Sequence, residues 1–277
     1  MSEPAPGSAP GQRRPAGAAR AAGERPVDGL DPQHPAAAFE REVRRNVERL
    51  GSDAELRALS LSWAARTAPY KYTYNFRWLG RPIIQFPQDI IAMQELIWSV
   101  RPQLVIETGV AHGGSLVFYA SMLELIGGVG LAVGIDVDIR EHNRAAIEQH
   151  PMSRRIRLIE GSSTSAATLE ALRPLAQDAE RVLVVLDSDH THAHVLRELE
   201  LYSPLVRKGG YLVVFDTIIE DMDDAFWVDR PWGRGNNPKT AVREFLSRND
   251  RFVVDREIEA RLQITVAPEG YLQCIRD

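Results

Sequence analysis

The chain has 277 residues, a length that fits one domain with room for an appended tail. Its formal net charge of -5 provides no basic field for a nucleic acid or an anionic membrane, so we expect neither as a partner. A single cysteine excludes an internal disulfide framework, and no apolar run reaches the length of a membrane span or a secretory signal. Together these features predict a cytoplasmic protein of enzyme size.

The N-terminal part of the sequence differs in composition from the rest. Residues 1–35 are mostly Ala, Pro, Gly, Arg and Glu, which bury too little apolar surface to offset the entropy lost on ordering, so we predict a disordered tail. Apolar residues then recur at helical spacing, which predicts a helix from Ala36 to about Leu61. An aromatic stretch, Tyr70–Trp78, follows. We interpret residues 36–85 as an extension that contacts the substrate or a second subunit.

From residue 86 onward, runs of Val, Ile and Leu alternate with stretches of helical periodicity. Continuous apolar runs are typical of strands that helices cover on both faces. Residues 86–277 are therefore predicted to form a doubly wound α/β domain, with a mostly parallel seven-stranded sheet and an antiparallel last strand. The predicted strands are Leu104–Gly109, Leu131–Asp136, Ile156–Gly161, Arg181–Asp187, Gly210–Asp216, Phe252–Asp255 and Ile264–Ile275.

The first predicted strand ends in a glycine-containing turn, Glu107-Thr108-Gly109-Val110-Ala111-His112-Gly113-Gly114-Ser115, where the backbone can approach a ligand. Ala111 stands where the dinucleotide fingerprint needs its second glycine. The acid Glu107 is unfavourable beside phosphates but suits the ammonium of a methionine moiety. The turn thus favours S-adenosyl-L-methionine over a nicotinamide dinucleotide, and the predicted contacts from it are Glu107, Gly109, Ala111, Gly113 and Ser115.

Two further strand ends fit an adenosine cofactor. Asp136 ends the second predicted strand, at the position where an acid hydrogen-bonds ribose hydroxyls. Ser162 and Ser163 follow the third strand and are small enough to line an adenine edge. Any one of these residues could instead cap a helix. Because the three strand ends occur in the right order, we predict that they bind S-adenosyl-L-methionine.

Asp187 and Asp216 end the fourth and fifth predicted strands. If these strands are neighbours, their carboxylates meet at one edge of the crevice, because adjacent strands lie ~4.8 Å apart. Two close carboxylates share a proton or bind a cation, and oxygen ligands favour Mg²⁺ or a similar divalent ion. We include Thr217 in the predicted ligand set, with Asp189, Glu220 and Asp221 as alternatives.

Three histidines follow Asp187, at positions 190, 192 and 194. Methyl transfer to an alcohol requires removal of the hydroxyl proton, and histidine is the natural base near neutral pH. His190 lies at the exit of the strand, so we predict that it is the catalytic base, acting beside Asp187. His192 and His194 fall in the next helical turn and are the alternatives.

Four segments carry a resemblance to a known family: Glu107–Ser115, Gly134-Ile135-Asp136, Asp187-Ser188-Asp189-His190 and Phe215-Asp216-Thr217-Ile218. Over about residues 65–277 they resemble the cephalosporin hydroxylase/rhamnosyl O-methyltransferase family. The resemblance implies a class I methyltransferase that uses S-adenosyl-L-methionine and methylates a deoxysugar such as rhamnose, in natural-product (antibiotic) or surface-glycan biosynthesis.

The resemblance also implies roles for individual residues. It makes Asp187 and Asp216 metal ligands, His190 the base, and the first turn, Asp136 and the serines after Gly161 the cofactor contacts. Family members often carry Glu-Asp after the fifth strand. Phe215-Asp216 stands there in this chain, which puts a third carboxylate ligand in doubt.

The sugar, or a glycosylated acceptor, is expected between the aromatic stretch and the loop Trp227–Lys239, where rings can stack on a sugar face. Gly235-Asn236-Asn237-Pro238-Lys239-Thr240 strengthens the resemblance to sugar-methylating members. The same surfaces could pack on a second subunit, and since related enzymes are oligomers we expect a homo-oligomer. The predicted substrate contacts are Tyr70, Tyr72, Tyr74, Trp78, Trp232, Asn236 and Asn237.

Other functions remain as alternatives. An oxygenase or hydroxylase could use His190, His192 and Asp187 as a facial set of two histidines and one carboxylate for iron. The three alternating histidines could hold zinc in a hydrolase, although the remaining histidines lack matching spacing. A dehydrogenase is disfavoured by Ala111, and a non-catalytic scaffold is disfavoured by the intact strand-end residues.

Overall fold

Seven strands form the central sheet: β3 (Leu104–Thr108), β4 (Leu131–Asp136), β5 (Ile156–Glu160), β6 (Val182–Leu186), β7 (Tyr211–Val214), β8 (Phe252–Val254) and β9 (Tyr271–Cys274). Their spatial order in this computed structural model, which describes residues 34–277, is β5-β4-β3-β6-β7-β9-β8. Only the pairs that β9 makes with β7 and β8 are antiparallel. The predicted doubly wound, mostly parallel sheet with an antiparallel last strand is confirmed. Residues 1–33 of the predicted tail lie outside the described residues.

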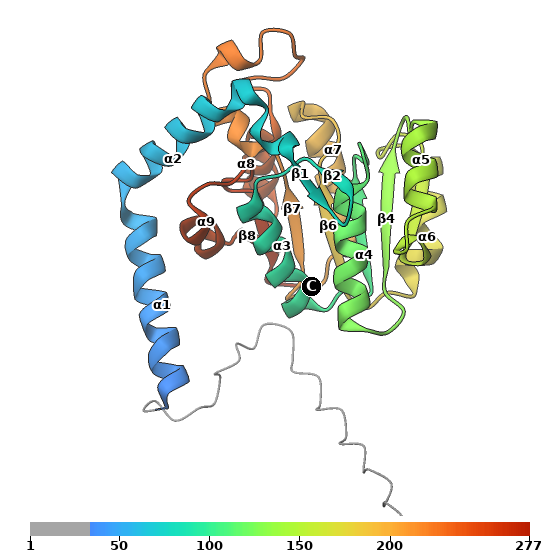
Figure 1. The fold of residues 1–277 in the computed structure, drawn as a ribbon, viewed down its shortest axis with the longest axis horizontal. Helices are drawn as coiled ribbons and strands as arrows, with labels where there is room; N and C mark the ends of the chain where they lie inside the picture. The colour runs from blue at the N-terminus through green and yellow to red at the C-terminus, as the bar shows by residue number, and fades with distance from the viewer. Residues whose placement is uncertain (1–33) are drawn as a thin grey trace, which may run out of the picture.

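Helices cover both faces of the sheet (Figure 1): α3 (Pro87–Val100), α4 (Gly114–Ile126), α5 (Glu141–Glu148), α6 (Ala166–Gln177), α7 (His192–Tyr202), α8 (Pro238–Arg248) and α9 (Arg256–Leu262). One buried cluster joins a face of the sheet to α3, α4 and α9 through side chains such as Met93, Phe118 and Ile258. The other face packs on α6, α7 and α8, through Leu172, Leu199 and Phe245. Within residues 34–277, no helix combines the length and apolar character needed to cross a bilayer.

The strand order fixes the position of the ligand crevice. From β3 the chain builds outward through β4 to β5, and then returns to the opposite side of β3 to add β6 and β7. The order therefore reverses at β3, and the loops that follow β3 and β6 diverge there. In open α/β sheets, ligands bind beyond the carboxyl ends of the strands at such a reversal.

Two helices, not one, form the start of the extension. The sequence predicts a single helix over residues 36–61, whereas the structure has α1 (Pro35–Ser52) and α2 (Ala54–Thr67). Asp53 separates them with an extended backbone, and its carboxylate accepts a hydrogen bond from the Leu56 amide at 2.9 Å. An aspartate in this position is a strong start signal for a new helix. α1 packs against α9, and α2 leads to the carboxyl edge of the sheet (Figure 1).

The aromatic stretch continues this path over the crevice. Two 3-10 turns, η1 (Ala68–Tyr70) and η2 (Tyr72–Asn75), lead into a hairpin of β1 (Phe76–Trp78) and β2 (Arg81–Ile83). The hairpin touches the turn after β3, because a Cβ atom on Gly114 would lie 2.0 Å from the carbonyl oxygen of Pro82. The hairpin, which is the last part of the extension formed by residues 36–85, is thus held beside the glycine turn.

The C-terminal segment differs from its prediction. A strand is predicted over Ile264–Ile275, but the strand comprises only Tyr271–Cys274, and the unpredicted helix α9 precedes it. The buried carboxylate of Asp89 takes the place of a strand partner: it accepts hydrogen bonds from Thr265 Oγ1 and the Val266 amide at 2.5 and 2.9 Å. Burial raises the pKa of Asp89 to about 6. This side-chain anchor, which periodicity cannot reveal, keeps the segment out of the sheet.

Candidate active site

The turn after β3 brings the main chain of β3 and β6 unusually close together. Gly109 has a φ of 90°, and a Cβ atom there would lie 2.0 Å from the carbonyl oxygen of Asp187. Only glycine accommodates both the left-handed backbone and this approach. Ala111 and Gly113 also have positive φ values, 44° and 75°. Gly109, Ala111 and Gly113, which are three of the contacts predicted for this turn, line one cavity of about 540 Å³.

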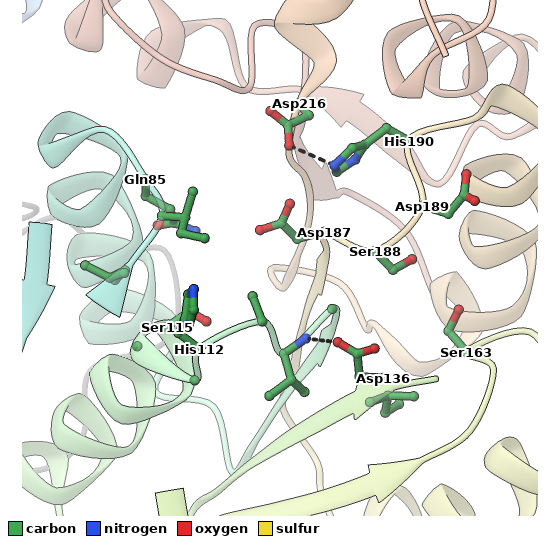
Figure 2. Close-up of a pocket in the computed structure, with 18 of the residues that line it drawn as sticks. Gln85, His112, Ser115, Asp136, Ser163, Asp187, Ser188, Asp189, His190 and Asp216 are labelled. Atoms are coloured by element: carbon green, nitrogen blue, oxygen red, sulfur yellow. Dashed lines mark hydrogen bonds and ion pairs between the residues drawn. The ribbon is translucent and has the colours of Figure 1, made fainter. Parts of the chain in front are cut away.

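Asp136 faces this turn from the end of β4 (Figure 2). Its Oδ2 accepts a hydrogen bond from the Val110 amide at 2.8 Å, and its Oδ1 accepts one from the Asp138 amide at 3.2 Å. Each carboxylate oxygen retains a further lone pair toward the cavity, which Asp136 lines. This position suits the ribose contact expected of Asp136.

Asp187, His190 and Asp216 form a cluster at the other end of the same cavity (Figure 2). One potential ligand atom from each residue lies within 4.8 Å of the others. His190 Nε2 is 3.2 Å from Oδ2 of Asp216, which has a left-handed φ of 56° directly after β7. Because β6 and β7 are neighbours, their two aspartates converge as the sequence predicts.

The electrostatics of the cluster favour a bound cation. Burial, together with the negative charge of Asp216, raises the pKa of Asp187 well above its usual range. Among the described residues that line this cavity, none is a lysine or an arginine. A cation would favour the charged form of Asp187 and so relieve the cost of gathering these carboxylates. The donor set therefore fits a divalent ion, with the remaining positions left to water or substrate.

The three alternating histidines do not meet at one site. His192 contacts Thr240 Oγ1 and Glu244 Oε2, each at 2.8 Å, on α8. His194 Nε2 lies 3.1 Å from Ser163 Oγ and 3.4 Å from Glu198. Only His190 is near both aspartates, so neither the zinc cluster nor the two-histidine iron set is assembled in the described residues.

The structure does not bring Thr217 to the cluster. Its side chain is fully buried, and its hydroxyl donates to the carbonyl oxygen of Pro268 at 2.7 Å. Two of the alternative ligands are also engaged elsewhere, since Glu220 accepts from the Gly235 amide and Asp221 pairs with Lys239. Asp189 lines the cavity but caps the Thr191 amide. The third residue of the cluster is therefore His190, the predicted base.

Two predicted cofactor contacts lie below or beside the cavity. Glu107 is fully buried and accepts a hydrogen bond from Ser115 Oγ at 2.7 Å, while Ser115 itself lines the cavity. Burial raises the pKa of Glu107 to about 8, so the carboxyl is mostly protonated at neutral pH. It supports the turn through Ser115 and is not among the residues that line the cavity. Ser163 lines the cavity, whereas Ser162 interacts with Thr164.

A second cavity, of about 490 Å³, shares the cluster with the first. Both are lined by Asp187, His190 and Asp216, and also by Tyr74, Gln85 and Trp232. The second cavity adds aromatic rings and two cationic side chains: Tyr72, Phe86, Phe226, Trp227, Lys71 and Arg230. The Trp232 ring stands edge-on to His190, with 4.8 Å between centroids. The predicted substrate residues Tyr72, Tyr74 and Trp232 therefore meet here.

Four other predicted substrate contacts lie away from both cavities. Tyr70 is 80% exposed, and Trp78 packs on Phe118 while its Nε1 donates to Ser121. Asn236 accepts a hydrogen bond from the His192 amide. Asn237 is buried, caps α8 and donates to Glu220 and to the Gly233 carbonyl. These two asparagines hold the loop in shape, and neither lines either cavity.

The sequence interpretation missed Gln85, Ser188 and His194 as lining residues. Gln85 is 2% exposed, and neither atom of its amide has a hydrogen-bond partner within residues 34–277. Its position immediately before Phe86-Pro87, where a helix begins, was a usable signal for a residue at a strand-to-helix junction. Ser188 follows Asp187 directly, and the sequence interpretation considers His194 only as an alternative base.

Comparisons with known proteins agree with this geometry. Residues 70–275 match the family described as rhamnosyl O-methyltransferase/CmcI. Rhamnosyl O-methyltransferase of Mycobacterium bovis (strain BCG / Pasteur 1173P2) is 33% identical over 190 residues, 66% of this chain and 72% of that protein. The protein of the same name from Mycobacterium tuberculosis (strain H37Rv) gives the same values.

Solved structures show the same fold. One described as "CmcI-N160 apo-structure" aligns with a TM-score of 0.53 at 20% identity, covering 74% of this chain and 78% of that one. One described as "cmcI-D160 Mg-SAM" also gives 0.53, at 21% identity, covering 73% and 77%. The resemblance found in the sequence is thereby confirmed. The chain belongs to the rhamnosyl O-methyltransferase/CmcI family.

Proposed function

We propose that this protein transfers a methyl group from S-adenosyl-L-methionine to a hydroxyl of a sugar, with assistance from Mg²⁺ or a similar divalent cation. The observation that carries the proposal is the pair of cavities that meet at Asp187, His190 and Asp216. A methyl transfer needs donor and acceptor side by side and aligned, with a base at their junction. The relatives named rhamnosyl O-methyltransferase support a sugar as the acceptor.

The charge of the first cavity favours this cofactor. Asp136, Asp187, Asp189 and Asp216 line it, and no lysine or arginine is found among its described lining residues. S-adenosyl-L-methionine carries a sulfonium and an ammonium group, which such a surface attracts. A dinucleotide would place a doubly charged pyrophosphate beside the same carboxylates. The description "Mg-SAM" of a solved relative agrees with the choice.

The second cavity suits a glycosylated acceptor. Its aromatic rings offer flat apolar faces for the C–H side of a sugar or for an attached apolar group. Hydroxyl groups could be bound by the amide of Gln85 and the Nε1 atoms of Trp227 and Trp232, for which the described part of the chain supplies no hydrogen-bond partner. Lys71 and Arg230 line the same cavity, and their side chains can donate hydrogen bonds to sugar oxygens but cannot accept them.

Asp187 and Asp216 would hold the cation, with His190 beside them. When bound, the cation would lower the cost of deprotonating the acceptor hydroxyl and orient its oxygen. His190 takes the hydroxyl proton, and Asp216, 3.2 Å from Nε2, stabilises the resulting imidazolium. The bound cofactor would supply the methyl group: its carbon–sulfur bond would break as the oxygen–carbon bond forms, and the electron pair would stay on the sulfur of S-adenosylhomocysteine.

The test is calorimetric titration of the full chain with S-adenosyl-L-methionine and with S-adenosylhomocysteine, with and without Mg²⁺, followed by mass spectrometry of a rhamnosylated acceptor after incubation. We expect the cofactor to bind. We also expect the mass of the acceptor to increase by about 14 units, because CH₃ replaces H, and we expect EDTA to suppress this increase. Preferential binding of NAD, or no methylation of any glycosylated acceptor, would refute the proposal.

A hydroxylase remains the second function to compare. The described cluster contains two carboxylates and one histidine, which is the reverse of the facial iron set. Because His192 and His194 are bound elsewhere, no rotation of a single side chain converts one set into the other. Oxygen consumption with Fe²⁺ and a 2-oxoacid is therefore expected to stay at background.

We also propose that the chain forms a homo-oligomer in the cytoplasm and acts in natural-product or surface-glycan biosynthesis. α1 packs on α9 but leaves Phe39, near its start, 63% exposed. Large exposed apolar side chains on a helix suit a contact with a second copy. Light scattering after size exclusion is expected to give a multiple of 30.9 kDa, and a monomer at high concentration would contradict this.

A further inference from the structure

Two cationic side chains, Lys71 and Arg230, line the second cavity and lie beside the rings that this cavity shares with the first. The Nζ atom of Lys71 is 5.8 Å from the centroid of the Tyr74 ring, and the guanidinium carbon of Arg230 is 5.4 Å from the centroid of the Trp232 ring. Tyr74 and Trp232 line both cavities, and the Trp232 ring stands edge-on to His190. The two positive charges therefore lie near the junction of the cavities.

Neither cation has a negatively charged partner in the described part of the chain. Lys71 and Arg230 form no ion pair within residues 34–277, although Asp229 directly precedes Arg230 in the sequence. Among the described residues that line this cavity, the only carboxylates are those of Asp187 and Asp216, which belong to the proposed cation site. A divalent ion bound there would balance these two carboxylates. The charges of Lys71 and Arg230 would remain uncompensated.

The other polar groups of this cavity that lack a partner are mainly hydrogen-bond donors. The Nε1 atoms of Trp227 and Trp232 are buried, and each can only donate. Gln85, which is 2% exposed, offers two amide protons and one acceptor oxygen, and these atoms have no partner within the described residues. Lys71 and Arg230 are donors only. A sugar hydroxyl brings a donor with each oxygen, whereas a phosphate or a carboxylate brings acceptor oxygens alone, so an anionic group satisfies this set better.

We propose that the acceptor sugar carries an anionic group, a phosphate or a carboxylate, which Lys71 and Arg230 bind. A planar guanidinium can form two parallel hydrogen bonds to such a group, and an ammonium adds a compact positive charge. The cavity, of about 490 Å³, has a size typical of small-molecule sites and has room for this group beside the sugar ring. The inference rests on the proposed function, because it assumes that the second cavity holds the sugar.

The experiment titrates the full chain, in the presence of S-adenosylhomocysteine and Mg²⁺, with anionic sugars and their neutral counterparts. Rhamnose 1-phosphate and dTDP-rhamnose carry phosphate, and methyl glucuronide carries a carboxylate. Methyl rhamnoside and methyl glucoside are the neutral counterparts. We expect at least one anionic probe to bind about tenfold more tightly than its neutral counterpart. The probe that does so shows whether the group is a phosphate or a carboxylate.

Single substitutions then assign the anion to the two cations. Lys71→Gln and Arg230→Gln each remove one charge from an exposed side chain, so the core is left intact. Each variant should weaken the anionic probe about tenfold and leave the neutral counterpart within about twofold of the wild type. Arg230→Lys keeps the charge and should recover part of the loss. Arg66→Gln is the matched control, because Arg66 is an exposed arginine of α2 that lines neither cavity.

The titrations are repeated without Mg²⁺, and the preference for the anionic probe should persist. Loss of that preference would overturn the inference, since the anion would then bind the cation at Asp187 and Asp216. Equal affinities for anionic and neutral probes would overturn it too, as would variants that weaken both kinds of probe alike or an equal loss in Arg66→Gln. A wild type that binds no S-adenosylhomocysteine would instead refute the proposed function, while anion binding that depends on Lys71 would still support the anionic site.

Discussion

The two cavities that meet at His190 are built in different ways. The first cavity, which we propose as the cofactor cavity, is formed by the ends of β3, β4 and β6, where main-chain hydrogen bonds fix the turns. The Gly109 amide donates to the Ile135 carbonyl at 2.8 Å, and the Asp187 amide donates to the Thr108 carbonyl at 2.9 Å. The second cavity, which we propose as the acceptor cavity, is formed by η2, the β2–α3 junction, the segment after β7 and the loop that carries Trp232. Side-chain packing holds these pieces together.

Because of this difference, the sheet holds the residues of the first cavity in fixed positions, whereas the surface of the second cavity can be changed by single side chains. The position of a strand end is determined by its hydrogen-bonded neighbours, so a substitution there disturbs the backbone of several strands at once. The rings of Tyr72, Trp227 and Trp232 come from segments outside the sheet, so the loss of one of them should change mainly the fit of the acceptor. Variants can therefore be chosen that affect the junction, the cofactor side or the acceptor side separately.

The largest effect is expected at the junction. His190→Ala removes the group that takes the proton, while its neighbours Asp187 and Asp216 keep their carboxylates. The turnover number should fall by about 10²–10⁴-fold, which is the range for loss of a general base. The affinity for S-adenosylhomocysteine should stay within about threefold of the wild type. Turnover near normal would show that His190 is not the base.

The next largest effect is expected on the cofactor side. Gly109→Ala would place a Cβ atom 2.0 Å from the Asp187 carbonyl at a φ of 90°, so we expect a loss of at least ~2 kcal/mol in the free energy of unfolding, or loss of cofactor binding. Gly209→Ala is the matched control, because Gly209 has a φ of 84° and open space around it. It should cost only the ~1 kcal/mol of the backbone conformation. Equal losses in chemical denaturation would show that the close approach is unimportant.

How much of this could be predicted from the sequence follows the same division. Asp136, Asp187 and Asp216 could be identified because apolar runs locate the strands, and parallel strands bring their carboxyl ends to one edge. The apolar runs also predict the sheet, whereas the family is predicted from the resemblance of the strand-end segments. His190 could be chosen as the base, but its place within the cluster depends on the path of the loop after β6.

The acceptor side could be predicted only as a region. Tyr74 and Trp232 line the junction, while Tyr70 and Trp78, from the same aromatic stretch, point elsewhere. Composition cannot distinguish them, because a short 3-10 turn and a hairpin alternate the directions of successive rings. Asn237 has the same limitation, since an amide that caps a helix and one that binds a sugar look alike in a sequence.

An effect of intermediate size is expected on the acceptor side alone. Trp227 lines the second cavity but not the first, and its Nε1 has no hydrogen-bond partner within the described residues. Trp227→Ala should raise the KM for the acceptor about tenfold, the loss expected from one aromatic contact, and leave cofactor affinity unchanged. Trp227→Phe keeps a ring without the N–H donor and should give a smaller increase. A change in cofactor affinity that matches the change in KM would show that the two cavities are not separable.

The smallest effect is expected beneath the cofactor side, where it depends on pH. Burial raises the pKa of Glu107 to about 8, whereas an unfolded glutamate titrates near ~4.3. Between these values the folded chain retains a proton that the unfolded chain releases. The free energy of unfolding must therefore fall as the pH rises, by up to ~1.4 kcal/mol per pH unit from this group. Glu107→Gln removes the titration and keeps an acceptor for Ser115.

Chemical denaturation of the ligand-free protein at pH 5, 6.5 and 8 (roughly spanning the titration) tests this expectation. Asp89 also has a raised pKa and contributes a slope of the same sign, but it is present in both proteins and cancels in their difference. The stability of Glu107→Gln relative to the wild type should therefore increase steadily with pH. Parallel curves would mean that Glu107 is ionised in the folded chain, and its carboxylate would then be available for an ammonium group after all.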